Sequence, residues 1–158
     1  MATNITESTN KFEVISSFEG DPFVGHLSTP ITTSNLTKAY LRLLPAYKSG
    51  LSPLLRGLNI GCVHGYFLLG PFVKLGPLRE SEVANFIGFV STISLILILT
   101  VCLLIYGYVT FSEKTSVRKT NVDFLTEKGW SEFTSGFILG GFGGTSIAYA
   151  LLKIIALG

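Results

Sequence analysis

The sequence predicts an all-α membrane protein with three transmembrane helices and a polar N-terminal extramembrane region. Three observations support this fold class. Apolar residues make up 47% of the 158 residues and charged residues only 14%, whereas soluble domains carry about 25% charged residues. The mean hydropathy is positive, at +0.52. The charged residues also leave three long uncharged segments, at 57–73, 83–112 and 133–152.

The N-terminal region, residues 1–53, is polar and is expected to lie outside the membrane. It contains no hydrophobic segment of the signal-peptide type. Glu7, Glu13 and Glu19 precede any arginine, which is unlike an acid-poor organellar transit peptide. We therefore expect the chain to be made on the side of the membrane on which its N-terminus stays.

The first predicted helix, about residues 54–75, is the weakest of the three as a membrane span. Its uncharged segment has 17 residues. This length is the lower limit for crossing a bilayer, so the helix needs tilt or neighbouring helices. It also contains Arg56, Asn59 and His64. Polar groups inside a membrane are costly and therefore point to a function.

The second and third predicted helices are longer. The second, about residues 83–111, lies in an uncharged run of 30 residues, and the third, about residues 132–155, contains an uncharged run of 20. Each run is long enough to cross a bilayer once. A polar loop, residues 112–131, joins these two helices. Three spans place this loop and the N-terminus on one side of the membrane and the C-terminus on the other.

Lysine and arginine are unevenly divided between the two sides. The side of the N-terminus has nine, namely Lys11, Lys38, Arg42, Lys48, Arg56, Lys114, Arg118, Lys119 and Lys128. The opposite side has three, namely Lys74, Arg79 and Lys153. The positive-inside bias therefore places the N-terminus in the cytoplasm or its organellar equivalent. Aromatic residues at that membrane boundary fit an interfacial belt: Tyr106, Tyr108, Phe111, Trp130 and Phe133.

Small residues recur at every fourth position in each predicted helix. The stripes are Gly57, Gly61 and Gly65; Ala84, Gly88 and Thr92; and Gly136, Gly140 and Gly144. In lipid, such stripes let helix backbones, or another flat surface, approach closely. Packing of the three helices against one another is one interpretation. Three stripes exceed what a small bundle requires, which favours partner subunits or flat prosthetic groups as further neighbours.

His64 lies near the middle of the first predicted span. A neutral imidazole is the commonest metal ligand, and a histidine beside a glycine surface suits axial ligation of a planar metallated macrocycle. An interhelical hydrogen bond is the other interpretation. Asn59 precedes His64 by five residues, or about 140° around a helix, so the two residues cannot share one metal. The second histidine, His26, belongs to the N-terminal region, which excludes a bis-histidine haem inside the membrane that is built from this chain alone.

Other classes of function lack the residues that they need. No carboxylate lies within a predicted span, so a proton relay is not indicated. No catalytic Ser/His/Asp set, zinc motif or phosphate-binding loop is present, and the chain is not expected to be an enzyme. A net charge of +2 gives no indication of nucleic-acid binding. Cys62 and Cys102 lie in apolar segments and are expected to be small core residues rather than a disulfide or a metal pair.

Four stretches resemble the photosystem I reaction-centre subunit XI family. They are GDPFVGHLSTPI (20–31), LPAYKSGLSPLLRGLNIGCVHGYFLLGPFVKLGPLRESEVAN (44–85), YG (106–107) and EKGWSEFTSGFILGGFGG (127–144). The resemblance implies one domain over residues 1–158, with three transmembrane helices. It places the N-terminus and the 112–131 loop on the stromal side and the C-terminus in the lumen. It further implies a multi-pass protein of the thylakoid membrane, in the plastid of a eukaryotic alga or in a cyanobacterium.

The same resemblance implies a non-catalytic subunit of photosystem I that binds chlorophyll a and contacts carotenoid, such as β-carotene, and lipid. Such a subunit contributes to antenna excitation transfer and to assembly or docking contacts. The implied partners are the small I subunit, the large reaction-centre subunits and peripheral antenna proteins. The alternative is a pigment-free membrane scaffold, whose glycine stripes only bind other helices.

The family pattern in the first span resembles LRG-x-E-x-G-x-x-H-G, in which the Glu and the His are axial chlorophyll ligands. His64 matches the His, and Asn59 occupies the Glu position. An amide oxygen is a weaker donor than a carboxylate, but magnesium favours oxygen ligands. No metal other than chlorophyll magnesium is expected. Cyanobacterial relatives have a longer tail that contributes to a trimer contact, and the chain here stops at LLKIIALG, so we expect a monomeric photosystem I, as in algae of the red lineage.

Overall fold

The computed structural model describes residues 14–17, 27–111 and 126–157. The chain divides into two compact units, residues 1–48 and residues 49–158. His26 and most of the predicted 112–131 loop lie outside the described residues.

The N-terminal unit contains two short strands and one helix. Strand β1 (Ser16–Ser17) pairs antiparallel with β2 (Leu27–Ser28), with Ser16 opposite Ser28. Helix α1 (Asn35–Leu43) begins at its N-cap, Ser34, whose hydroxyl accepts a hydrogen bond from the Thr37 backbone N–H at 3.1 Å. Such a cap satisfies one of the backbone donors that every helix start leaves free. The sequence analysis did not predict α1 or this small sheet.

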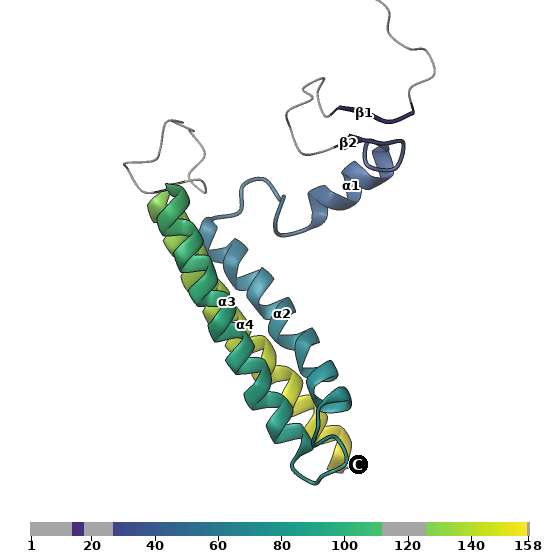
Figure 1. Ribbon diagram of the computed structural model, residues 1–158, viewed down its shortest axis with the longest axis vertical. Helices are drawn as coiled ribbons and strands as arrows, with labels where there is room; N and C mark the ends of the chain where they lie inside the picture. Colours follow the sequence, from purple (N-terminus) through teal and green to yellow (C-terminus); the bar gives the residue numbers. More distant parts are fainter. Residues whose placement is uncertain (1–13, 18–26, 112–125, 158) are drawn as a thin grey trace, which may run out of the picture. The chain divides into compact units, whose positions relative to one another are not determined.

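The second unit contains three long helices, α2 (Pro53–Leu75), α3 (Ala84–Phe111) and α4 (Glu127–Leu157), which lie side by side (Figure 1). Helix α3 runs antiparallel to both others, so α2 and α4 are parallel. Among the described residues, two segments are long and apolar enough to cross a membrane. They are α3, with a hydropathy of 2.6, and Glu127–Ile155 of α4, with a hydropathy of 1.5. Helix α2 is not among them, because glycines and polar residues dilute its apolar side chains.

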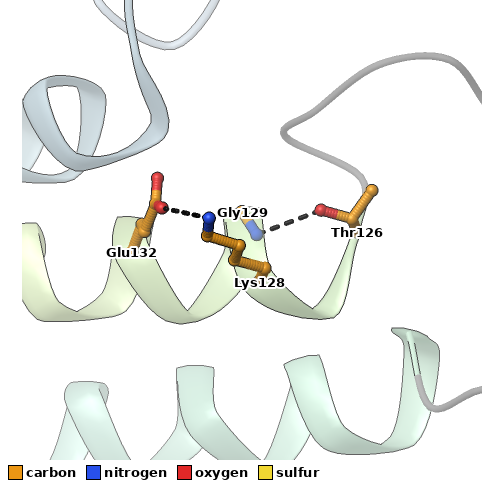
Figure 2. Close-up of polar contacts among 4 residues, drawn as sticks. All are labelled: Thr126, Lys128, Gly129 and Glu132. Atoms are coloured by element: carbon orange, nitrogen blue, oxygen red, sulfur yellow. Dashed lines mark hydrogen bonds and ion pairs between the residues drawn. The ribbon is translucent and has the colours of Figure 1, made fainter.

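Local capping explains where α2 and α4 begin. The Ser52 hydroxyl accepts a hydrogen bond from the Leu55 N–H, and Pro53, at the first helical position, has no N–H to satisfy. At the start of α4 the Thr126 hydroxyl accepts from the Gly129 N–H at 3.0 Å, as Figure 2 shows. Lys128 and Glu132 form an ion pair one turn apart. Because of this polar first turn, α4 begins five residues before the helix start expected at about 132.

Two glycine stripes join α2 and α4 backbone to backbone. Gly57, Gly61 and Gly65 are buried on α2. A methyl group at Gly61 would collide with the carbonyl oxygen of Phe137, and one at Gly140 would collide with the carbonyl oxygen of Leu58. The contact is reciprocal along both helices: Gly57, Gly61 and Gly65 face the backbone of α4, and Gly136, Gly140 and Gly144 face the backbone of α2. Only glycine permits backbones to approach this closely.

Helix α3 packs on this pair through smaller contacts. Gly88 of α3 lies against Val73 of α2, and the Ile96 side chain fills the space beside Gly141 of α4. Ile96 and Thr92 have no exposed surface. The interpretation that the stripes serve partner subunits or flat groups is therefore wrong for the stripes of α2 and α4. Packing within this chain accounts for them.

Buried hydroxyl groups satisfy themselves within their own helix. Thr92, Thr100, Thr134 and Thr145 are buried. Each donates its hydroxyl proton to the backbone carbonyl four residues earlier, at 2.7–2.9 Å. A buried hydroxyl without a partner would cost about 1–3 kcal/mol. These threonines therefore act as small packing residues and leave the helix contacts free of unmet polar groups.

Trp130 and Phe133, near the start of α4, form a packed cluster with Tyr106 and Phe111 of α3. The Trp130 ring lies 5.0 Å from those of Tyr106 and Phe133 and 5.4 Å from that of Phe111, between centroids. Its indole N–H donates to the Leu103 carbonyl at 2.7 Å. Phe133 is buried, with 6% of its surface exposed. This cluster ties α4 to the end of α3.

The two cysteines are not bonded to each other. Both thiols are free; Cys62 is partly buried, and Cys102 is exposed on α3. The prediction that both are core residues is therefore wrong for Cys102. Its side chain lies on the outer surface of the most apolar helix, where a small apolar residue carries no packing constraint.

The glycine contact predicts opposite effects for two neighbouring substitutions in α4. Gly140→Ala places a methyl group against the backbone of α2, and we expect it to lower the free energy of unfolding by ~2 kcal/mol, because an overpacked contact must open. Gly143→Ala is the matched control, since no other group lies within 4 Å of a methyl group at this position. Gly143→Ala should leave stability within about 0.5 kcal/mol or raise it slightly.

The measurement is an SDS titration of the full chain in mild detergent micelles, followed by far-ultraviolet circular dichroism. Equal unfolding midpoints for the two alanine variants would contradict the backbone contact between α2 and α4.

Candidate functional site

Helix α2 carries both predicted ligand residues, and α4 determines which of its faces remain accessible. Gly61, three residues before His64, and Gly65, directly after it, are covered by the α4 backbone. His64 and Asn59 are themselves exposed. They lie about 140° apart around the helix axis, so the structure does not bring them together. They form two separate positions on different faces of α2.

The His64 ring is held by a hydrogen bond to its own helix. Its Nδ1 lies 2.8 Å from the Ile60 carbonyl oxygen. Since a carbonyl only accepts hydrogen bonds, Nδ1 must carry the proton and act as the donor. In the neutral imidazole, Nε2 then carries the lone pair. Metal-binding histidines commonly have this arrangement, in which a carbonyl fixes the tautomer and the opposite nitrogen meets the metal.

The immediate surroundings of His64 are aromatic and apolar. The ring meets Phe137 of α4 edge to face, with 5.7 Å between centroids. Val63 and Phe67, on the same helix, are exposed. The glycines beside His64 are occupied by α4, so the flat surface expected next to this residue is not a glycine surface.

Asn59, on a different face of α2, is also held by a hydrogen bond to the preceding turn of its own helix. Its Nδ2 donates to the Leu55 carbonyl at 2.8 Å. The reverse amide orientation would place two acceptor oxygens against each other, so the amide nitrogen must face Leu55. The side-chain oxygen Oδ1 is consequently free of hydrogen bonds from the part of the chain that the structure describes. Asn59 is exposed, so this neutral oxygen can offer a lone pair to a metal.

These two positions fit the axial coordination of a tetrapyrrole magnesium. Each presents one neutral atom with a lone pair, His64 Nε2 or Asn59 Oδ1, and each is exposed enough for a macrocycle. The other polar atom of each side chain is already satisfied within α2. Within residues 14–17, 27–111 and 126–157, no group of three or more His, Cys, Asp or Glu side chains is arranged to hold a free metal ion.

Sequence reasoning missed the residues that orient the two donors. The carbonyls of Leu55 and Ile60 each lie four residues before the side chain that they hold. This spacing is the signal that was available, because Asn and His side chains can bond back to the preceding turn of a helix. Phe137 was missed as well, since a ring contact between helices depends on how α2 and α4 are aligned.

Comparisons with known proteins agree with the resemblance. The family model for "Photosystem I reaction centre subunit XI" matches residues 14–157. The chain is similar to proteins named photosystem I reaction center subunit XI from Trieres chinensis, 55% identical over 141 residues (89% of this chain, 93% of the relative), and from Gracilaria tenuistipitata var. liui, 55% over 144 residues (90% and 93%). The corresponding protein of a Cyanothece species is 54% identical over 142 residues (89% and 87%).

The matched range begins two residues before β1 and extends to the last residue of α4, so it contains the α2–α4 glycine contact and both His64 and Asn59. The chain therefore belongs to the photosystem I reaction centre subunit XI family.

Proposed function

We propose that this chain is a non-catalytic, chlorophyll a-binding subunit embedded in the thylakoid membrane, which contributes to antenna excitation transfer and to the assembly contacts of photosystem I. Membership of the family supports its association with that complex. The single observation that supports pigment binding is the geometry of His64. Its Nδ1 is hydrogen-bonded to the Ile60 carbonyl, which leaves the Nε2 lone pair of an exposed residue available to a metal.

In this proposal α2 crosses the membrane as well as α3 and α4, so the chain has three transmembrane helices. Its 23 residues span about 34 Å, enough for a hydrocarbon core of about 30 Å. Asn59 and His64 each bond to the preceding turn, which lowers the cost of placing them in lipid. The close contact with α4 supplies the support that so weakly apolar a span needs. The basic N-terminal side is then stromal and the C-terminus lumenal.

His64 would hold the magnesium of one chlorophyll a through Nε2. The Ile60 carbonyl fixes the ring orientation and the tautomer by accepting a hydrogen bond from Nδ1. Phe137 limits rotation of the imidazole from the side of α4. The bound pigment supplies light absorption and excitation transfer, while the chain supplies its position and a low-dielectric environment.

Asn59 would hold a second chlorophyll through Oδ1. A neutral amide oxygen donates less charge to magnesium than the carboxylate that the family pattern has at this position. The two pigments would lie on different sides of α2, since their ligands are about 140° apart.

The outer surfaces of the bundle would meet carotenoid, lipid and neighbouring subunits. Helix α3 exposes a long series of apolar side chains: Val90, Leu97, Ile98, Val101, Leu104, Ile105 and Val109. In a membrane such a surface faces acyl chains, β-carotene or other helices. The proposed protein partners are the large reaction-centre subunits, the small I subunit and peripheral antenna proteins.

Replacing the His64 ligand tests the proposal. His64→Leu removes Nε2 and should abolish one chlorophyll a site, because no other donor of α2 faces the same direction. The cryogenic absorption spectrum of the purified complex, normalised to protein, should lose the contribution of one chlorophyll relative to the unchanged complex. His64→Gln, which restores a donor atom, should recover part of that absorption.

The control is Val63→Leu, a change at an exposed apolar neighbour that alters no ligand. An unchanged spectrum in a His64→Leu complex that retains this chain would support the alternative, a pigment-free scaffold. That alternative is weakened here because the glycine stripes of α2 and α4 bind each other.

A second substitution series tests Asn59. Asn59→Glu introduces a stronger oxygen donor and should retain the pigment with a shifted absorption band, whereas Asn59→Leu should lose it. The same cryogenic spectra are the readout. Identical spectra for Asn59→Leu and the unchanged protein would show that Oδ1 holds no pigment, without affecting the proposal for His64.

A further inference from the structure

Helix α1 of the N-terminal unit has three distinct sides. Thr37 and Leu41, one turn apart, are partly buried and face the rest of their unit. Leu36, Tyr40 and Leu43, at spacings of four and three residues, form an apolar side. Lys38 and Arg42 form a basic side. No residue of α1 is buried, so two of its three sides have no cover from the residues of this unit that the structure describes.

The apolar side is unusually open for large hydrophobic residues. The exposed fractions are 82% for Leu36, 61% for Tyr40 and 78% for Leu43. Ile31, just before the helix, is 77% exposed. Apolar residues gathered on one side of a short amphipathic helix indicate a surface that is buried elsewhere.

The charged residues of α1 and of the sequence that follows it up to α2 are all basic. Between Asp21 and Glu80 the sequence contains no acidic residue. Four basic residues of this stretch precede the apolar segment of α2. They are Lys38, Arg42, Lys48 and Arg56. Among the described residues, Lys38 and Arg42 take part in no ion pair. Their charge therefore remains available to an anionic partner.

The chain also keeps α1 close to the membrane. Only residues 44–52 separate the end of α1 from the start of α2. Nine residues extend over at most about 32 Å. If α2 spans the membrane, as proposed above, α1 cannot move far from the bilayer surface on the basic side.

We propose that α1 lies in the interface of the stromal leaflet, with Leu36, Tyr40 and Leu43 between the acyl chains and Lys38 and Arg42 against anionic lipid headgroups. A helix with a basic side and an apolar side binds a bilayer through both. Anionic lipids favour each basic residue near the surface. This inference rests on the proposed membrane insertion of α2, but not on pigment binding.

The test uses the full chain reconstituted in vesicles of phosphatidylcholine with or without phosphatidylglycerol. With the native cysteines replaced by alanine, a fluorophore is attached to a cysteine at Leu36→Cys or, as the matched control, at the adjacent Asn35→Cys on the polar side. In vesicles with phosphatidylglycerol, brominated lipids should quench the label at position 36, and an aqueous quencher should not reach it. The label at position 35 should behave in the opposite way.

Removing charge should weaken this docking. Lys38→Gln and Arg42→Gln should each lower the ratio of docked to undocked α1 roughly fivefold in vesicles with phosphatidylglycerol, a factor corresponding to about 1 kcal/mol per basic residue. High salt should act in the same direction on the Leu36→Cys protein without any further substitution. This salt series keeps the test valid if a glutamine variant fails to fold.

Equal access of the aqueous quencher to positions 35 and 36 would overturn the proposal and leave the apolar side of α1 for a protein partner. A separate protein in which Cys102 is the only cysteine reports insertion of the bundle, because Cys102 is exposed on α3. Lipid quenching at Cys102 without quenching at position 36 refutes the α1 inference alone. Absence of quenching at both positions refutes the membrane insertion on which it rests.

Discussion

The close contact between the backbones of α2 and α4 determines the rest of the helical unit. Two glycine stripes face each other, so carbonyl oxygens of one helix occupy the space where side chains of the other would be. In lipid the hydrophobic effect does not hold helices together, and close packing must replace it. If α2 spans the membrane as proposed, this contact compensates for its low hydropathy, which results from its glycines and polar groups. Helix α3 then packs on the pair through its own Ile96 and through contacts with Trp130 of α4.

The same contact determines which polar atoms face outward. With one face of α2 covered by α4, His64 and Asn59 lie on the faces that remain accessible. Each uses its one proton-donating atom toward the helix carbonyl four residues earlier. Each thereby leaves a single lone-pair atom exposed. Two polar residues of α2 thus each present one atom with a lone pair. Axial coordination of a macrocycle requires such an atom.

Sequence patterns predicted the helical class, and family resemblance indicated the candidate ligand positions, but neither showed how the stripes are used. A four-residue spacing of glycines is the same whether the neighbour is a helix, a subunit or a pigment. Only the alignment of α2 with α4, which depends on residues about 76 positions apart such as Gly61 and Phe137, shows that the neighbour is internal. Helix α1 escaped prediction because nine residues are too few for a clear periodic signal beside long apolar segments. The orientation of His64 depends on a side-chain rotation that sequence does not encode.

A high-resolution density map of the photosystem I complex containing this chain would test the proposed role of α2 most directly. The decisive measurement is the distance from His64 Nε2 to the nearest tetrapyrrole magnesium. We expect magnesium within coordination distance of Nε2, while Nδ1 remains hydrogen-bonded to Ile60 and the glycines of α2 still face the backbone of α4. A map in which Nε2 instead donates a hydrogen bond to a neighbouring helix, with no magnesium beside it, would contradict the proposed role of α2.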